Sequence, residues 1–224
     1  MFPIGDDNVR GSHPAFITWL LLILNVVIFL FEATLSEPAL TRFIQEYGVI
    51  PAEIMSGQDM HTLLTSIFLH GGWLHLIGNM LFLWVFSDNI EAVLGAPLYL
   101  AFYLAGGLAA SVAHILSGPA STIPSVGASG AIAAVLGAYI VMFPQSRVRL
   151  LVLFGYRAGV TRVSAIVFLG IWAVTQFFSG VASLGVPTAQ TGGVAWFAHI
   201  GGFVFGLAIG ALLRGRAARA ALTG

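Results

Sequence analysis

Residues 126–143 read VGASGAIAAVLGAYIVMF and contain no charged side chain. At the rise of a helix, a run of this length extends for ~27 Å, close to the thickness of the hydrocarbon core of a bilayer. Ser129 lies three residues into the run, between Gly127 and Gly130. The stretch therefore predicts a membrane-spanning helix that carries a serine near one of its ends.

The composition of the whole chain agrees with a membrane environment. Of its 224 residues, 58% are hydrophobic and 8% are charged, whereas soluble domains carry about 25% charged residues. The formal net charge is zero and there is no basic run, so we expect the lipid bilayer as a partner and no nucleic acid. The absence of cysteine excludes disulfide bonds, a thiol nucleophile and thiolate metal ligands. We interpret residues 1–224 as a single membrane domain.

Apolar runs of this kind recur along the chain and predict an all-α membrane protein, because lipid leaves no backbone group unsatisfied and strands of alternating polarity are absent. We expect a bundle of six transmembrane helices, over residues 14–31, 73–86, 97–116, 126–143, 164–184 and 196–213. The second run is short for a crossing that needs ~20 residues. It is therefore expected to begin earlier, near residues 63–69, or to be shielded by other parts of the protein.

The arginines are unevenly distributed between the two sides of a six-span arrangement. One side carries Arg10, Arg147, Arg149, Arg157, Arg162, Arg214, Arg216 and Arg219. The other side carries Arg42, together with several acidic residues. By the positive-inside rule, the N- and C-terminal tails at residues 1–13 and 214–224 are cytoplasmic.

The segment 36–72 is then an outer loop. Within it, residues 38–47 and 51–54 mix apolar and acidic side chains at roughly helical spacing, which predicts short helices lying in the membrane interface. The alternative is an ordered surface loop without membrane contact. The loop at residues 185–195 is interpreted as a cap over the site, and the fifth span as a lateral gate.

Four polar side chains from three predicted spans lie at one depth, in the outer half of the membrane. They are His75 and Asn79 in the second span, Ser129 in the fourth and His199 in the sixth. Polar groups are costly in lipid and normally face a bundle interior or a water-filled cavity. Hydrogen bonding between helices is one use of such residues, and a serine activated by a histidine is another. Their shared depth and complementary chemistry favour catalysis.

Two pairs of glycines accompany the candidate reacting groups. Gly127 and Gly130 remove side chains on both sides of the serine, where a substrate backbone must approach closely. Gly202 and Gly206, four residues apart, form a ridge of small residues in the sixth span. Such a ridge allows another helix to approach closely, in our interpretation the fourth span. Both pairs are therefore expected to have structural roles.

The absence of some residue types disfavours other catalytic chemistries. No Asp or Glu lies near the outer ends of the fourth and sixth spans, so the serine and histidine would act as a dyad without a carboxylate. There is no H-E-x-x-H sequence, which disfavours a zinc protease, and no pair of intramembrane aspartates. We expect no metal and no cofactor. A metal site formed by His61, His70 and His75 is the alternative.

Three short motifs resemble those of the rhomboid family of intramembrane serine proteases. They are His75-Leu76-Ile77-Gly78-Asn79, Gly127-Ala128-Ser129-Gly130 and Ala198-His199-Ile200-Gly201-Gly202. The motifs occur in the family's order and in the expected spans. The resemblance covers nearly the whole chain and implies a six-helix core of the bacterial type.

The resemblance also implies a role for each motif residue. Ser129 would be the nucleophile and His199 the general base. His75, Asn79 and the backbone N–H of Ser129 would form the oxyanion hole. Glu91 resembles a structural acid of the family, which accepts hydrogen bonds from another helix.

The chain departs from the family pattern in two places. Many members have an aromatic residue one turn after the serine, where this chain has Ala133. The ring against which the histidine packs would then come from Trp196 or Phe197. Some members have a Trp-Arg pair in the first outer loop, which is absent here. Neither departure removes a reacting group.

We therefore expect an intramembrane serine endopeptidase that hydrolyses peptide bonds in or next to transmembrane segments of other membrane proteins. Its expected location is the plasma or inner membrane, with the active site open to the extracytoplasmic side. The alternative is a catalytically inactive rhomboid-like protein that binds or escorts client proteins. A transporter is a further alternative, but paired broken helices and ionisable residues near the midplane are not evident in the sequence.

Overall fold

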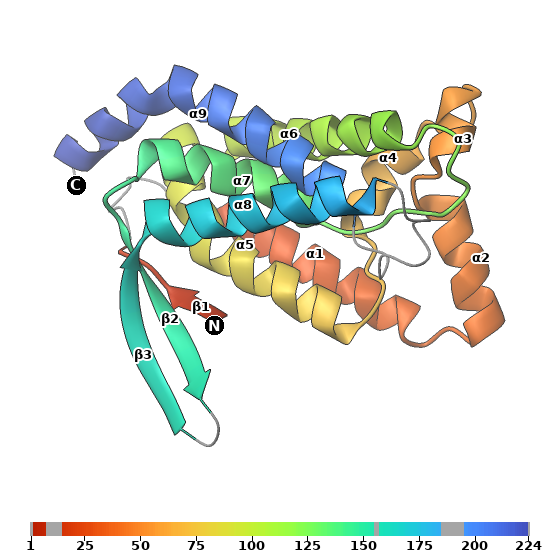
Figure 1. The fold of residues 1–224 in the computed structure, drawn as a ribbon, viewed down its shortest axis with the longest axis horizontal. Helices are drawn as coiled ribbons and strands as arrows, with labels where there is room; N and C mark the ends of the chain where they lie inside the picture. The colour runs from red at the N-terminus through yellow and green to blue at the C-terminus, as the bar shows by residue number, and fades with distance from the viewer. Residues whose placement is uncertain (1, 8–14, 155–156, 185–194, 224) are drawn as a thin grey trace.

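The structure of the protein is a computed structural model that describes residues 2–7, 15–154, 157–184 and 195–223. Its main feature is a bundle of apolar helices (Figure 1). Within these described residues, four helices are long and apolar enough to span a membrane, namely α5 (Trp73–Leu94), α6 (Ala96–Ser117), α8 (Ala165–Ser183) and α9 (Trp196–Thr223). Two more are shorter, α1 (Phe16–Glu32) and α7 (Ser129–Met142). The protein is thus a multi-pass membrane protein in which each predicted apolar run forms a helix.

The shortest of these helices lies in the middle of the bundle. α7 is flanked by α5, α6, α8 and α9 (Figure 1), and eleven of its fourteen residues are buried. At 1.5 Å per residue it extends for ~21 Å, less than the ~30 Å of a hydrocarbon core. Because protein surrounds α7, its length is not set by the bilayer, and its ends lie among other helices.

The second span begins at residue 73, as predicted, but ends later than predicted. Half of its apolar window is buried inside the protein, as the shielding alternative expects. The expected earlier start near residues 63–69 is wrong, because those residues form the short helix α4 (Thr62–Thr65) and the 3-10 helix η1 (Ser66–Phe68). Gly72, with a φ of +152°, precedes the first residue of α5. At the other end the helix continues to Leu94 through several buried polar residues. Asn89 and Glu91 have hydrogen-bond partners inside the protein, so their burial does not end the helix.

A buried carboxylate near the end of α5 holds the first turn of α1. Glu91 accepts a hydrogen bond from the backbone N–H of Ile17 at 2.7 Å. It also accepts hydrogen bonds from the backbone N–H and the hydroxyl of Thr18, both at 2.7 Å. The first N–H groups of a helix have no partner within the helix and carry partial positive charge, which suits a carboxylate. The prediction that Glu91 accepts hydrogen bonds from another helix is confirmed.

The segment 36–72 contains the predicted short helices. They are α2 (Glu37–Tyr47) and α3 (Pro51–Met55), at one end of the bundle (Figure 1). Their position in a membrane interface stays a prediction. Val49 and Ser125 form an isolated antiparallel bridge, and the N–H of Gly127 donates to the carbonyl oxygen of Ser66 at 2.9 Å. These bonds fix the chain that leads into α7.

The all-α prediction is wrong at the other end of the bundle. There β1 (Phe2–Gly5), β2 (Arg147–Phe154) and β3 (Arg157–Ser164) form an antiparallel sheet in that order. β2 and β3 pair without interruption, and they project away from the helices (Figure 1). The rule that excludes open strands holds only within lipid. Outside the helices, water satisfies the strand edges, and a sequence rich in valine favours strands.

The residue that follows β1 anchors the N-terminal segment to the bundle. Asp6 is buried, and its carboxylate accepts hydrogen bonds from the hydroxyl of Tyr139 in α7 and from Nδ2 of Asn89 in α5, the latter at 2.8 Å. Burial is the main cause that raises the pKa of Asp6 from 3.8 to about 6. The end of α7 away from Ser129 is therefore tied to the start of the chain.

Candidate active site

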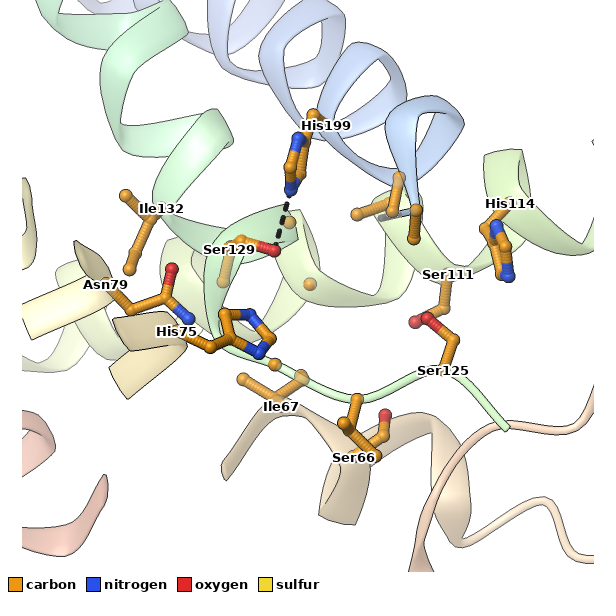
Figure 2. A pocket seen from close by; sticks show the side chains of 18 of the residues that line it. Ser66, Ile67, His75, Asn79, Ser111, His114, Ser125, Ser129, Ile132 and His199 are labelled. Atoms are coloured by element: carbon orange, nitrogen blue, oxygen red, sulfur yellow. Dashed lines mark hydrogen bonds between the residues drawn. The ribbon is translucent and has the colours of Figure 1, made fainter. Parts of the chain in front are cut away.

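A cavity of about 650 Å³ lies beside the first turn of α7. Its polar lining comprises Ser66, His75, Asn79, Ser111, His114, Ser125, Ser129 and His199 (Figure 2). The four residues that the sequence analysis assigns to one layer are all in this set. Helices α5, α6, α7 and α9 each contribute at least one of these side chains.

Ser129 is the first residue of α7 and does not lie three positions inside it. The predicted start at residue 126 is wrong, because residues 126 and 127 have no regular structure and Ala128 is the N-cap. This position leaves the N–H groups of the first turn without partners within the helix. Oγ of Ser129 is 2.8 Å from Nε2 of His199 (Figure 2). The hydroxyl and the imidazole are thus within hydrogen-bond distance.

Close contact between the backbones of α7 and α9 brings the two side chains together. A Cβ on Gly202 would overlap the carbonyl oxygen of Gly130. A Cβ on Gly206 would overlap the carbonyl oxygen of Ala134. The predicted contact between the small-residue ridge and the fourth span is therefore present, and it leaves no room for a side chain at either position.

The other ring nitrogen of His199 meets a residue that the sequence analysis does not identify. Nδ1 of His199 is 2.7 Å from Oε1 of Gln176 in α8. Gln176 is only 8% exposed, although most of α8 is not buried. Gln176 could have been identified from the sequence as an amide side chain in an apolar span, because such a group normally faces the interior of the bundle.

Two tryptophan rings contact His199. The ring centroid of Trp172 in α8 is 6.0 Å from that of the imidazole. The ring centroid of Trp196 in α9 is 6.2 Å from it, in an edge-on arrangement. Trp196 is one of the two residues expected to compensate for Ala133, whereas Trp172 is not predicted. The imidazole is therefore packed by rings as well as held at both nitrogens.

Gly127 allows His75 and Asn79 to lie beside the start of α7. Its φ is +131°, which favours glycine, and a Cβ there would come within 2.7 Å of Nε2 of His75. The N–H of Gly71 donates to Nδ1 of His75 at 3.4 Å, so the proton of the neutral ring is on Nε2, which faces Gly127. Both side chains lie on the far side of Ser129 from His199 (Figure 2).

Asn79 has a hydrogen-bond donor without a partner. Its Nδ2 is buried and makes no hydrogen bond with the residues that the structure describes. An unsatisfied buried donor costs about 1–3 kcal/mol, so native proteins rarely keep one without a use. Nε2 of His75 and Nδ2 of Asn79 lie 2.7 and 3.7 Å from the position of a Cβ on Gly127, and the free N–H groups of the first turn of α7 follow two residues later, so these donors form a set beside Ser129. Such a set can stabilise negative charge on an oxygen.

The remaining histidines of the outer segment do not form a metal site. His70 is buried, and its ring centroid is 5.2 Å from that of His75. The backbone N–H of His70 donates to the Glu32 carboxylate at 3.2 Å. Burial lowers the pKa of His70 to about 4. His61 packs against Tyr47. Within the described ranges, no three His, Asp or Glu side chains are grouped so that they could hold a metal ion.

Comparison with known proteins identifies the family. Residues 57–216 match the family model for the Rhomboid domain. The chain is 29% identical over 204 residues to Rhomboid protein 1, mitochondrial, of Saccharomyces cerevisiae, an alignment that covers 89% of this chain and 54% of the relative. It is 28% identical over 221 residues to Rhomboid protease GluP of Bacillus subtilis, which covers 92% and 41%.

A third relative is Presenilin-associated rhomboid-like protein A, mitochondrial, of Danio rerio. It is 32% identical over 155 residues, which cover 66% of this chain and 40% of the relative. The chain thus spans about half of the length of these relatives or less. The matched region contains all the candidate site residues, from His75 to Gly206.

Proposed function

The chain belongs to the rhomboid family, and we propose that it is a serine endopeptidase that cleaves peptide bonds in or next to transmembrane segments of other membrane proteins. The observation that carries the proposal is the 2.8 Å distance between Oγ of Ser129 and Nε2 of His199. A serine hydroxyl becomes a strong nucleophile when an adjacent base takes its proton. The name of one relative, a rhomboid protease, supports the same activity.

In the proposed mechanism, Ser129 and His199 act as a dyad. Oγ of Ser129 attacks the scissile carbonyl carbon while Nε2 of His199 accepts the hydroxyl proton. The imidazolium then gives this proton to the leaving amine as the C–N bond breaks. A water molecule attacks the resulting ester, again with His199 as the base, and Ser129 is regenerated with release of a carboxylic acid.

His75, Asn79 and the backbone N–H of Ser129 are proposed to form the oxyanion hole. Negative charge develops on the carbonyl oxygen when the tetrahedral intermediate forms, and it needs donors that are already in place. Nδ2 of Asn79 gains its missing partner at that moment. The interaction is then stronger in the transition state than in the free enzyme, as catalysis requires.

The position of the site supports the proposed class of substrate. The cavity lies between helices of a membrane bundle, so a substrate enters from the membrane or from its edge. An intact helix shields its carbonyl groups, and small or helix-breaking residues near the scissile bond therefore favour cleavage.

The topology that completes the proposal has six spans in one rhomboid-like domain, with cytoplasmic termini and a site open to the extracytoplasmic side. For the location we propose a plasma or inner membrane; two of the relatives above are named as mitochondrial proteins. Residues 185–194 of the proposed cap lie outside the described residues. The cap, and α8 as a lateral gate, stay predictions.

Two substitutions with a matched control test the proposal. We expect Ser129→Ala to abolish both cleavage of a model transmembrane substrate and labelling by a fluorophosphonate, because the nucleophile is gone. Ser125→Ala removes another serine of the same cavity and should keep both activities. His199→Ala should be nearly as inactive as Ser129→Ala, and combining them should cost little more, since residues acting as a unit are not additive. Substantial turnover by folded Ser129→Ala protein would disprove the proposal.

A further inference from the structure

Among the helices around the site, α8 is much less enclosed than α7. Four of its nineteen residues are buried, namely Ala165, Leu169, Gln176 and Gly180. The rest of its surface includes exposed valine, isoleucine and phenylalanine side chains. Such a surface suits lipid. The narrow buried stripe nevertheless contains the amide that reaches His199.

The hydrogen bonds around Gln176 determine which atom of its amide faces His199. The hydroxyl of Thr175 donates to the carbonyl oxygen of Trp172, one turn earlier in α8, at 2.6 Å. Nε2 of Gln176 donates to Oγ1 of Thr175 at 3.4 Å. The amide nitrogen is thus directed back to its own helix. The amide oxygen is left to face Nδ1 of His199 at 2.7 Å.

This direction selects one of the two tautomers of His199. An amide oxygen only accepts hydrogen bonds, so Nδ1 must carry the proton and Nε2 of the neutral ring is an acceptor. Nε2 is the nitrogen 2.8 Å from Oγ of Ser129. The serine hydroxyl therefore donates to the imidazole, which is the arrangement that a general base requires.

We propose that Gln176 is the positioning residue of His199, and that α8 thereby determines whether the dyad can react. The inference rests on the proposed function. In a Ser-His-Asp triad, a carboxylate on Nδ1 holds the histidine in the correct tautomer and orientation. His199 has the Gln176 amide in that place.

The location of Gln176 has a consequence for control of the site. Ser129 and His199 belong to α7 and α9, whereas Gln176 belongs to the less enclosed α8. A displacement of α8 from α9 breaks the bond to Nδ1. The imidazole can then adopt the tautomer with its proton on Nε2, which cannot accept the serine proton. Docking of α8 is therefore a condition for nucleophile activation.

The test compares substitutions in the full-length protein in detergent. Gln176→Met keeps the length of the side chain but removes both hydrogen bonds, whereas Gln176→Glu keeps an acceptor for Nδ1. We expect Gln176→Met to lower kcat and the rate of fluorophosphonate labelling about ten-fold, as for loss of one buried hydrogen bond, with KM little changed. Gln176→Glu should recover most of this loss. Thr175→Val removes the hydroxyl that accepts the hydrogen bond from Nε2 of Gln176, and it should have a smaller effect in the same direction.

NMR of isotope-labelled histidine nitrogens gives a readout that does not depend on activity. The signals of His199 are those that disappear in His199→Ala. In the wild-type and Ser129→Ala proteins we expect the proton on Nδ1, and in Gln176→Met a mixture of both tautomers.

An unchanged tautomer and an unchanged rate in Gln176→Met would overturn the positioning role. Gln176→Leu takes the place of this variant if it does not fold. A wild-type protein that neither labels nor cleaves, but whose tautomer still depends on Gln176, would instead contradict the proposed function. The two failures are therefore distinguishable.

Discussion

Helix α9 contacts α7 on one side and α8 on another, and the two contacts are built differently. Against α7, a Cβ on Gly206 would overlap the carbonyl oxygen of Ala134, and a Cβ on Gly137 would overlap that of Phe203. Against α8, a Cβ on Gly180 would lie 2.9 Å from Cδ1 of Ile200, at the movable end of a side chain. The first contact, the α7–α9 seam, is backbone against backbone. The second is made through side chains that can rotate.

The difference separates two requirements of the site. The distance between the proposed nucleophile, Ser129, and the proposed base, His199, must be held closely, and the α7–α9 seam holds it through backbone contacts that cannot yield. The orientation of His199 can be adjustable, and in our proposal it depends on Gln176 in the more exposed helix. A glycine-to-alanine substitution is therefore expected to have different effects on stability in the α7–α9 seam and in the α8–α9 contact.

The largest effect is expected from Gly206→Ala in the α7–α9 seam. The added methyl group meets the Ala134 carbonyl, so the two helices must separate, and we expect a loss of stability of about 3 kcal/mol or more. Thermal unfolding in detergent measures the loss, and labelling of Ser129 should fall with it. Gly170→Ala in α8 is the control, because a Cβ there meets nothing within 4 Å. If Gly206→Ala unfolded at the same midpoint temperature as the wild type, the α7–α9 seam could open without loss of stability.

A smaller effect is expected at the other end of α7, where Tyr139 binds Asp6. Because the pKa of Asp6 is raised to about 6 in the folded protein, the folded state binds the proton more tightly. The stability that this proton binding contributes is complete below the pKa of Asp6 in the unfolded chain, 3.8. It is lost as the pH rises through the pKa of the folded protein, about 6. The side chain of the Asp6→Asn variant is uncharged at every pH, so the variant lacks this pH-dependent contribution to stability.

The measurement for Asp6 is the difference in unfolding free energy between the wild type and Asp6→Asn at several pH values. We expect the wild type to lose about 2 kcal/mol relative to the variant between pH 4 and 7. Parallel profiles for the wild type and Asp6→Asn would mean that Asp6 is not buried when the bundle is folded.

The smallest effect is expected from Gly180→Ala, the counterpart of the first substitution in the α8 contact. Rotation of the Ile200 side chain accommodates the methyl group, so the change in unfolding free energy should stay below about 1 kcal/mol. The same unfolding experiment applies, with Gly206→Ala beside it. Equal losses in the two variants would remove the distinction between a fixed and an adjustable contact.

The α7–α9 seam was accessible to sequence reasoning because its parts leave local signals. Ser129 and His199 are polar residues in apolar runs, and the spacing of Gly202 and Gly206 marks a face that another helix can approach. Hydropathy locates the helices, but their ends depend on contacts that it does not record. For this reason α5 extends past the predicted end and α7 begins at Ser129.

The contact with Gln176 and the β-sheet could not be read in the same way. Gln176 belongs to no motif, and its partner is 23 residues further along the chain, so their meeting depends on how α8 packs against α9. β1 pairs with β2, which is far away in the sequence, and a strand of four residues has no periodicity that identifies its partner. Local sequence patterns predict helices, whereas the Gln176–His199 contact and the β1–β2 pairing depend on the tertiary arrangement.

The pairing of β1 with β2 also sets an order of events during synthesis. Phe2 pairs with Leu151, and Asp6 binds Tyr139. The ribosome adds roughly 5–20 residues per second, so the first strand waits for several seconds or longer before its partners exist. By then α1, α5, α6 and α7 have all been made. The residues of β1 can thus reach their native contacts only after these four apolar helices have been synthesised, whereas β3, α8 and α9 follow later in the chain.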